Sequence, residues 1–299
     1  MRSETTPQKT ALVLCGGGIL GAMEVGFYKA LVELGVKIDL VVGTSIGALN
    51  GALIAAGVEP EALARLWRQA RMRDFFTFDW SLLWRGWRAE SLFSNRRFRR
   101  YLETHLPVRR FERLGRPLII TATDVETGLT VELGPAEGDL VSAVLASAAL
   151  PGLFPPVRID GRDSIDGGVS ANCALDVALA HGATTILAME CRCGSKGTPR
   201  TRGFLARIRH AFGLALEAKY RADVDRYSDR ASLILVPPNV AEGVRCSDLR
   251  DAGKLIEAAY QAAKAQLEVN SAGSAIRRPI FRRPADSSVL KGMRQGCEL

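Results

Sequence analysis

Histidine and paired cysteine are scarce in this sequence, and their scarcity excludes several kinds of chemistry. The 299 residues include three histidines (His105, His181 and His210) and six cysteines with no C-x-x-C pair. Zinc sites in proteins are built from clustered Cys and His ligands. We therefore expect no metal site. The scattered cysteines are typical of free thiols in a reducing compartment.

The sequence also lacks an apolar segment typical of a signal peptide or a membrane span. Residues 1–9 are polar and lead directly into the first predicted strand. One apolar run, residues 40–58, is long enough to cross a bilayer, but it contains Thr44, Ser45, Asn50 and four glycines. A strand, a sharp turn and a buried helix explain this run better, so we expect a cytoplasmic location.

Positive charge is in excess. The chain has 40 Lys and Arg against 32 Asp and Glu, a net charge of +8 and a pI near 9.4. Such a balance suits nucleic acid, an anionic membrane or acidic substrates, and net charge alone does not choose among them. Contents of 47% hydrophobic and 24% charged residues are ordinary for a globular protein.

Short apolar runs alternate with helical patterns along most of the chain. Strands separated by helices indicate an α/β fold with a mainly parallel central sheet flanked by helices on both faces. The predicted strands are residues 11–15, 40–42, 118–123, 130–133, 185–190 and 232–236, and the predicted helices are 22–34, 47–56, 140–148, 175–180, 204–227 and 247–269.

These elements indicate one domain, residues 10–270, between a polar N-terminal tail (1–9) and a basic tail rich in Arg, Pro and Ser (271–299) that we expect to be flexible. Within the domain, residues 70–110 interrupt the alternation with aromatic and basic side chains. We interpret this segment as a lid-like insertion.

The glycine cluster after the first strand, "CGGGILG", fits two templates. Gly16, Gly18 and Gly21 spell the G-x-G-x-x-G of a dinucleotide-binding loop. That fold requires an acidic residue at the end of its second strand, whereas Asp39 stands at the start of this one. The alternative is an oxyanion hole, with backbone N–H donors from about Gly17 and Gly18. We favour the oxyanion hole.

A second motif, "GTSIG", supplies G-x-S-x-G through Gly43, Ser45 and Gly47. It follows a short apolar strand and opens a helix, the context in which such a serine is a nucleophile. A nucleophilic serine needs a base. His181 fits the last turn of a helix and His210 lies in a basic helical stretch, so neither is well placed. Asp166, followed by Gly167 and Gly168 in "IDGG", is the better candidate.

Four motifs in this order, the glycine loop, "GTSIG", "ASAALPGLFPP" and "DGG", closely resemble the patatin-like phospholipase family. The resemblance spans roughly residues 11–172. It implies a patatin-type three-layer fold and a Ser–Asp dyad without histidine, with Ser45 as nucleophile and Asp166 as proton acceptor. It also implies hydrolysis of a phospholipid, lysophospholipid or acylglycerol ester without cofactor, metal or nucleic acid. Many members carry Arg or Lys where this chain has Leu20, so the oxyanion hole relies on backbone donors.

All four tryptophans lie between positions 67 and 87, and a basic stretch, residues 95–110, follows. Tryptophan and arginine together suit a lipid–water boundary, although aromatic residues also pack into ordinary cores. Beside a lipase site, the basic stretch favours peripheral contact with an anionic membrane. Two other functions stay open: a histidine-dependent esterase or acyltransferase, and a catalytically silent lipid- or nucleotide-binding protein.

Overall fold

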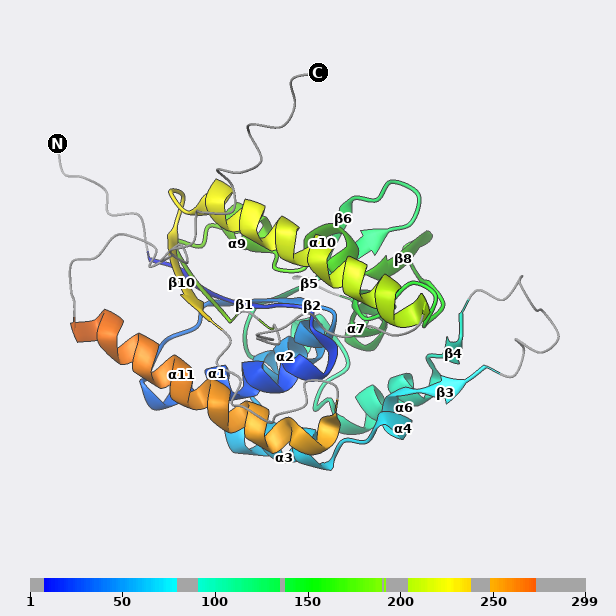
Figure 1. The fold of residues 1–299 in the computed structure, drawn as a ribbon, viewed down its shortest axis with the longest axis horizontal. Coiled ribbons are helices and arrows are strands. Elements are labelled where there is room, and N and C mark those ends of the chain that lie inside the picture. The colour runs from blue at the N-terminus through cyan, green and yellow to red at the C-terminus, as the bar shows by residue number, and fades with distance from the viewer. Residues whose placement is uncertain are drawn as a thin grey trace, which may run out of the picture.

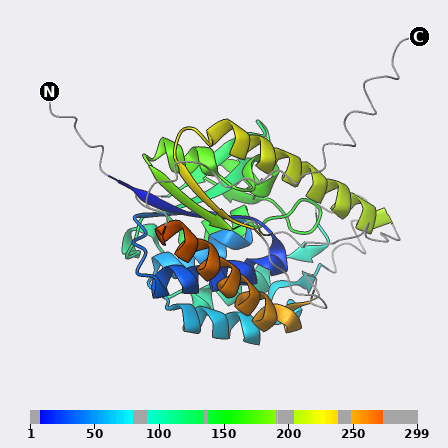
Figure 2. The same ribbon diagram turned by 60° about the vertical axis from the view of Figure 1, so that its left-hand side comes forward.

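The computed structural model describes residues 8–79, 91–134, 138–189, 191, 204–237 and 248–272. They form a three-layer α/β fold with a central sheet between two layers of helices (Figures 1 and 2). The predicted fold is therefore confirmed. Both predicted tails fall almost wholly outside the described residues, as does the middle of the predicted insertion, residues 80–90.

The main sheet has eight strands, seven of them in the order β10-β9-β1-β2-β5-β8-β7, with β6 also paired to β5. Four pairings are parallel (β10–β9, β9–β1, β1–β2 and β2–β5), and β5–β6, β5–β8 and β7–β8 are antiparallel. The strands are β1 (Thr10–Leu14), β2 (Leu40–Thr44), β5 (Leu118–Asp124), β6 (Thr130–Leu133), β7 (Val157–Ile159), β8 (Arg162–Asp166), β9 (Thr185–Met189) and β10 (Ser232–Val236). A separate hairpin joins β3 (Thr77–Phe78) to β4 (Phe93–Ser94).

Helices cover both faces of the sheet. The layer that includes α1, α2, α7 and α11 lies on one face and α9 and α10 lie on the other (Figure 1). The helices are α1 (Gly21–Glu33), α2 (Ile46–Ala55), α3 (Pro60–Gln69), α4 (Met72–Phe75), α6 (Arg96–His105), α7 (Leu140–Ser147), α8 (Gly168–Ala171), α9 (Leu175–Ala180), α10 (Phe204–Tyr227) and α11 (Ala252–Ala272). Short 3-10 turns are η1 (Gly18–Leu20), η3 (Phe111–Arg113) and η4 (Leu249–Asp251).

The strands alternate their side chains between the two helical layers. In β1, Leu12 and Leu14 enter the core on the α1 side, whereas Ala11 and Val13 enter the core on the α9 side. Side chains of successive strand residues point to opposite faces, so a strand covered on both faces is apolar throughout. This is why the central strands appear in the sequence as continuous apolar runs.

The parallel register brings the glycine loop and the serine turn to the same edge of the sheet. Leu14, the last residue of β1, pairs with Gly43, and Thr44 pairs with Thr121 of β5. Parallel strands end at one edge, where the loops that follow them converge. The segments after β1 and β2 are the two that carry the sequence motifs.

Helix α11 packs along α1 through a close crossing. A Cβ placed on Gly26 of α1 would lie 2.0 Å from the carbonyl oxygen of Ile256 and 2.7 Å from the backbone nitrogen of Tyr260. Only glycine permits this approach. Among the described residues, no helix combines the length and apolar character that crossing a bilayer requires.

Candidate active site

Ser45 occupies a sharp turn between β2 and α2. Its backbone has φ 55° and ψ −120°, a conformation that non-glycine residues rarely adopt. The turn fits because both neighbouring glycines leave room: a Cβ on Gly47 would lie 2.4 Å from the carbonyl oxygen of Leu14, and one on Gly43 would lie 2.6 Å from that of Gly47. The strained turn holds the serine hydroxyl above the N-terminus of α2, where backbone N–H groups favour negative charge.

The hydroxyl of Ser45 contacts a carboxyl group from the antiparallel part of the sheet. Ser45 Oγ donates a hydrogen bond of 2.6 Å to Oδ2 of Asp166, the last residue of β8. Asp166 pairs with Ala122 of β5, next to the residue that faces Thr44 in β2. The register of three strands thus brings the two side chains together, and both are buried.

The environment of Asp166 shifts its protonation. Burial raises the pKa of its carboxyl to about 6, and the hydrogen bond from Ser45 opposes that shift. The backbone N–H of Gly168 also donates to Oδ1 at 2.7 Å, which likewise lowers the pKa. A carboxylate with a pKa near 6 is ionised at neutral pH and is more basic than an ordinary aspartate. The carboxylate of Asp166 can therefore accept the proton of the Ser45 hydroxyl when that hydroxyl attacks an electrophile.

Further hydrogen bonds fix the serine turn to its neighbours. The N–H of Ser45 donates to Oγ of Ser147 at 2.8 Å, and that hydroxyl donates to the carbonyl of Thr121 at 2.6 Å. The hydroxyl of Thr123 donates to the carbonyl of Asp166 at 2.8 Å. These contacts attach the backbone of both members of the pair to β5 and to the end of α7.

The glycine loop, residues 16–21, lies against Ser45. A Cβ on Gly16 would lie 3.2 Å from Cβ of Ser45 and 2.4 Å from Oδ1 of Asn172, whose carbonyl accepts the N–H of Gly16 at 3.2 Å. Gly18 has φ +58° with open space around it, and within the described residues neither its N–H nor that of Gly17 has a backbone acceptor. Through Gly16 the loop therefore lies directly against the serine, the placement that the predicted oxyanion hole requires.

The other predicted glycines make close approaches. A Cβ on Gly21, at the start of α1, would lie 2.8 Å from the side chain of Ile46. One on Gly167 would lie 2.3 Å from the carbonyl oxygen of Thr121, and one on Gly168 would lie 2.9 Å from Oδ1 of Asp166. The "DGG" sequence thus lets the chain turn close under the carboxyl group.

The three histidines lie elsewhere. His181 follows α9 and its Nε2 pairs with Oε2 of Glu132 at 2.7 Å, while His210 is exposed on α10. His105 bonds the carbonyl of Tyr101 through Nδ1 at 2.8 Å. None of them contacts Ser45 or Asp166. No group of three or more His, Cys, Asp or Glu side chains in the described part of the chain is arranged to hold a metal ion.

Asp39 lies at the opposite edge of the sheet. Its Oδ2 accepts the N–H of Thr10, the first residue of β1, at 3.0 Å. A dinucleotide site needs an acidic group at the other end of the second strand, beside the glycine loop. The position of Asp39 therefore disfavours a dinucleotide at this loop.

Several residues that build the site are not among those predicted from the sequence. Ser147 and Asn172 lie inside the motifs "ASAALPG" and "DGGVSAN", but their contacts depend on the distant segments that those motifs meet. Glu24 was also missed. It is a lone acid in the apolar start of α1, and it is buried beside Asn50 and Cys191. An ionisable residue inside an apolar run was the one available signal.

The predicted insertion, residues 70–110, is described at its two ends. Phe75 packs edge-on against Phe98, and Phe76 stacks on Phe154, as aromatic residues do in a core. The N–H of Phe93 donates to the carbonyl of Leu153 at 2.9 Å, which attaches the insertion close to the site. The tryptophans at positions 80, 84 and 87, and with them the centre of the predicted lid, lie outside the described residues.

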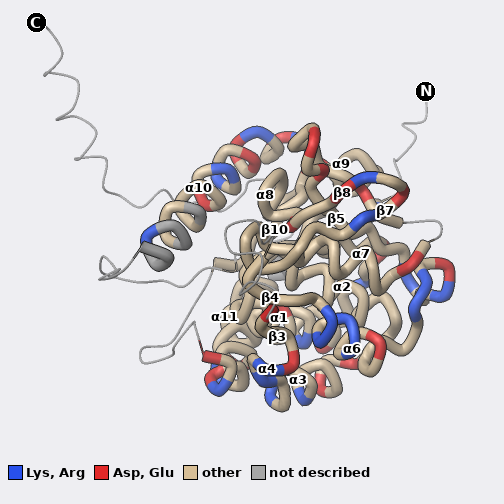
Figure 3. The backbone as a smooth tube through the Cα atoms, turned by 90° about the vertical axis from the view of Figure 1, so that its right-hand side faces the viewer, with Lys and Arg blue, Asp and Glu red and all other residues tan. Residues whose placement is uncertain are grey.

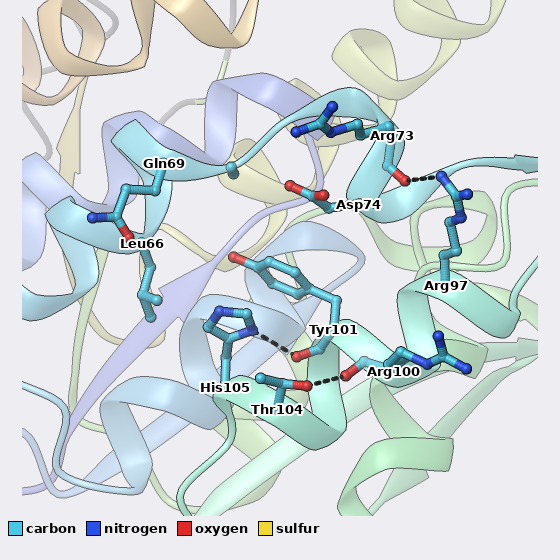
Figure 4. A pocket seen from close by; sticks show the side chains of 10 residues that line it. Leu66, Gln69, Arg73, Asp74, Arg97, Arg100, Tyr101, Thr104 and His105 are labelled. Atoms are coloured by element: carbon cyan, nitrogen blue, oxygen red, sulfur yellow. Dashed lines mark hydrogen bonds between the residues drawn. The ribbon is translucent and has the colours of Figure 1, made fainter.

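A cavity of about 530 Å³ opens between α3, α4 and α6 (Figure 4). It is lined by Leu66, Gln69, Ala70, Arg73, Asp74, Arg97, Arg100, Tyr101, Thr104 and His105. Arg97 is turned toward the carbonyl of Arg73, to which it donates a hydrogen bond of 3.0 Å. Neither Ser45 nor Asp166 lines this cavity, so it is separate from the candidate site.

Residues 12–179 match the sequence profile of the family described as "Patatin-like phospholipase". Over 193 residues the chain is 33% identical to patatin-like phospholipase domain-containing protein 7 of Rattus norvegicus, covering 62% of this chain and 14% of that protein. Over 196 residues it is 32% identical to lysophospholipase NTE1 of Mycosarcoma maydis, covering 64% and 10%. The chain thus spans about a seventh or less of the length of these relatives. VipD from Legionella pneumophila matches in structure with a TM-score of 0.45 at 15% identity, covering 88% of this chain and 67% of that one.

Proposed function

Because this chain belongs to the patatin-like phospholipase family, we propose that it is a serine hydrolase that cleaves carboxylic ester bonds of lipids. The observation that carries the proposal is the 2.6 Å hydrogen bond from Ser45 Oγ to Asp166 Oδ2, made from a strained strand-to-helix turn. A nucleophile and a base within hydrogen-bond reach are the minimum for covalent acyl transfer.

In the acylation step, Ser45 Oγ attacks the ester carbonyl carbon and its proton passes to Asp166. The carbonyl oxygen becomes an oxyanion, which the N–H groups of Gly17 and Gly18 stabilise. Collapse of this intermediate breaks the ester C–O bond, and Asp166 returns the proton to the departing alcohol. Leu20 carries no charge, so the oxyanion depends on backbone donors.

In the deacylation step, a water molecule gives its proton to Asp166 and attacks the acyl carbon. The second tetrahedral intermediate expels Ser45 Oγ, which takes the proton back from Asp166. The products are a fatty acid and the free enzyme. Asp166 thus serves as base and then as acid in each half-reaction, a task that suits a carboxyl whose burial raises its pKa to about 6.

The substrate class we propose is a phospholipid, lysophospholipid or acylglycerol. The names of the relatives, patatin-like phospholipase and lysophospholipase, support an acyl ester of this kind. We further propose peripheral contact with an anionic membrane. Arg96, Arg97, Arg99 and Arg100 of α6 support it, because α6 belongs to the segment attached beside the site and carries basic residues in succession (Figure 3).

Two other functions find less support. A histidine-dependent esterase would need a histidine beside Ser45, whereas His181 pairs with Glu132 and His210 is exposed. A silent binding protein would have no need for a serine held in a strained turn against a buried carboxyl group.

A fluorophosphonate probe with mass-spectrometric mapping tests the proposal. We expect covalent labelling at Ser45, none in the Ser45→Ala variant, and fatty acid release from at least one lipid in a panel of phospholipids, lysophospholipids and acylglycerols. A protein that the probe does not label would exclude the hydrolase and favour the binding function. Labelling that is lost in His181→Asn with His210→Asn would favour the histidine-dependent enzyme.

A further inference from the structure

Glu24 is a buried acid that the proposed reaction does not use. It lies in the first turn of α1, directly after the glycine loop, and is 1% exposed. Its Oε2 accepts a hydrogen bond of 2.8 Å from Nδ2 of Asn50. Its Oε1 lies 3.6 Å from Sγ of Cys191, and the backbone N–H of Cys15 also bonds the carboxyl. One carboxyl group thus joins segments that follow β1 and β9 to helix α2.

Asn50 extends this network to the end of the glycine loop. Its Nδ2 also donates to the carbonyl of Gly21 at 2.9 Å, and its Oδ1 accepts Nε1 of Trp67 at 2.9 Å. Asn50 is fully buried on α2, the helix that starts immediately after Ser45. The pair Glu24 and Asn50 therefore fixes the loop relative to the nucleophile.

Cys191 connects Glu24 to the middle of the loop. A Cβ placed on Gly17 would lie 3.0 Å from Cβ of Cys191 and 3.4 Å from its carbonyl oxygen. Gly17 is one of the two proposed oxyanion donors. Cys191 therefore lies against both the Glu24 carboxyl and a residue of the proposed oxyanion hole.

We propose that Glu24 is a positioning residue for the oxyanion hole, which it holds against the nucleophile helix through Asn50 and Cys191, and that it acts in its neutral form. This proposal rests on the proposed function. Ionisation of Glu24 would place a negative charge behind the oxyanion donors. Like charges repel strongly in a buried site, so the charged form opposes the transition state.

The groups that face Glu24 give its negative charge no counter-ion. Those from the strand ends are the thiols of Cys191 and Cys15 and the backbone N–H of Cys15, and the side chain that α2 contributes is the neutral amide of Asn50. Helix α11 packs along α1, and its Lys264 pairs with Glu33 at the far end of α1. Burial raises the pKa of Glu24 to about 8, and the groups that oppose this shift are the hydrogen bonds of Asn50, Cys191 and Cys15 rather than a cation of the described residues. Glu24 is therefore neutral at pH 7.

The test compares the wild type with Glu24→Gln, which keeps the shape and the neutral charge, and with Glu33→Gln, a matched control further along α1. The measurements are kcat and KM for p-nitrophenyl butyrate and the rate of fluorophosphonate labelling at Ser45, from about pH 6 to 10. We expect the wild-type and control rates to fall as pH rises through about 8, by up to about tenfold per pH unit. We expect the Glu24→Gln rates to stay level there. A decline that persists in Glu24→Gln would overturn the proposal.

Glu24→Leu tests the anchoring contacts. It removes the acceptor for Asn50 and the N–H of Cys15, so kcat should fall by on the order of tenfold at pH 7 with KM nearly unchanged. An unchanged kcat in folded Glu24→Leu would also overturn the proposal. The pH profile of Glu24→Gln decides the matter if Glu24→Leu does not fold.

Unfolding measurements separate the failure of this inference from the failure of the proposed function. A wild-type Ser45 that no probe labels would reject the hydrolase. Between about pH 4.5 and 8, Glu24 ionises in the unfolded chain but stays protonated in the folded protein, so the stability of the wild type falls as pH rises. Glu24→Gln lacks this group, so the difference between its urea midpoint and that of the wild type should increase over this range. A constant difference across that range would reject a neutral Glu24 whatever the protein catalyses.

Discussion

The Ser45 hydroxyl and the Asp166 carboxyl lie 2.6 Å apart, although 121 positions separate them in the chain. The contact depends on the parallel pairing of β2 with β5 and the antiparallel pairing of β5 with β8. Because two strand registers set the distance between Ser45 and Asp166, a small shift in either register would break their hydrogen bond.

Loss of either member of the pair should abolish hydrolysis. Ser45→Ala removes the nucleophile and Asp166→Asn removes the base, so each should lower kcat by several orders of magnitude. Such residues act as a unit, and the double variant should be scarcely slower than either single one. The matched control is Asp163→Asn, an exposed aspartate on the same strand. Substantial turnover in Asp166→Asn would mean that another group is the base.

Activity should rise with pH through about 6. Asp166 accepts a proton only when ionised, and burial raises its pKa to about 6. The value of kcat/KM on a soluble ester should therefore fall about tenfold per pH unit below this point. An acid limb centred near pH 4 would show that Asp166 titrates as an ordinary exposed aspartate.

Asp166→Asn should be more stable than the wild type at neutral pH, although inactive. The pKa of Asp166 is about 6 in the folded protein against a reference of 3.8, so the stability this carboxyl contributes is fully present below about 3.8 and is lost as pH rises through 6. This loss of wild-type stability is at most about 3 kcal/mol. The gain in Asp166→Asn is smaller if the new amide group faces the N–H of Gly168, because two donors then oppose each other. Urea unfolding at pH 3.5 and pH 7.5 measures the difference, and an equal midpoint shift at both would contradict this account.

Gly18→Ala should slow turnover far more than its backbone strain explains. Gly18 and Gly35 both have positive φ, +58° and +66°, and a Cβ placed on either would meet open space. Alanine should cost each position about 1 kcal/mol of stability. Because Gly35 follows α1 at the far end from the loop, Gly35→Ala should keep its kcat. Gly18→Ala should lose on the order of a hundredfold if it displaces one oxyanion donor. Equal kcat in the two variants would show that the glycine loop does not stabilise the transition state.

Hydrolysis on anionic vesicles should depend on salt and on α6. Each basic residue near an anionic surface adds about 1 kcal/mol of attraction, which salt screens. Arg96→Gln with Arg97→Gln should therefore weaken activity on phosphatidylserine vesicles, while a short soluble ester is cleaved as before. Trp80→Ala and Trp84→Ala should show the same split. Arg226→Gln, on α10 across the sheet, is the control. Equal losses on both substrates would argue against membrane contact.

The α/β class and the site motifs could be predicted because each is local. The strand at residues 11–15 and its glycine loop are adjacent in sequence, and so are β2 and the Ser45 turn. The hairpin β7–β8 was harder, since strands of three and five residues carry little periodicity. It nevertheless supplies Asp166, which the sequence identified through a short strand-like segment, the "DGG" motif and the family resemblance.

The contacts around the pair could not be predicted because they join distant segments. Ser147 meets Ser45 only after α7 packs beneath β5, and Glu24 meets Cys191 only after β9 pairs with β1. Burial, which raises the pKa of both Asp166 and Glu24, is likewise a property of the assembled fold. A single ionisable residue in an apolar run indicates that a charged or polar group is buried there, but it does not identify the residue that this group contacts.

The crossing of Gly26 with Ile256 has a consequence for biosynthesis. Helix α1 is translated early in the domain, yet α11, which crosses it so closely, is made more than two hundred residues later. Until then the nascent chain lacks the helix that covers α1, and for most of that interval β1 also lacks its partner β9. Contacts of such long sequence separation cost loop-closure entropy and make folding slower. The nascent chain on the ribosome therefore carries every motif of the proposed hydrolase before it has the α1–α11 packing of the finished domain.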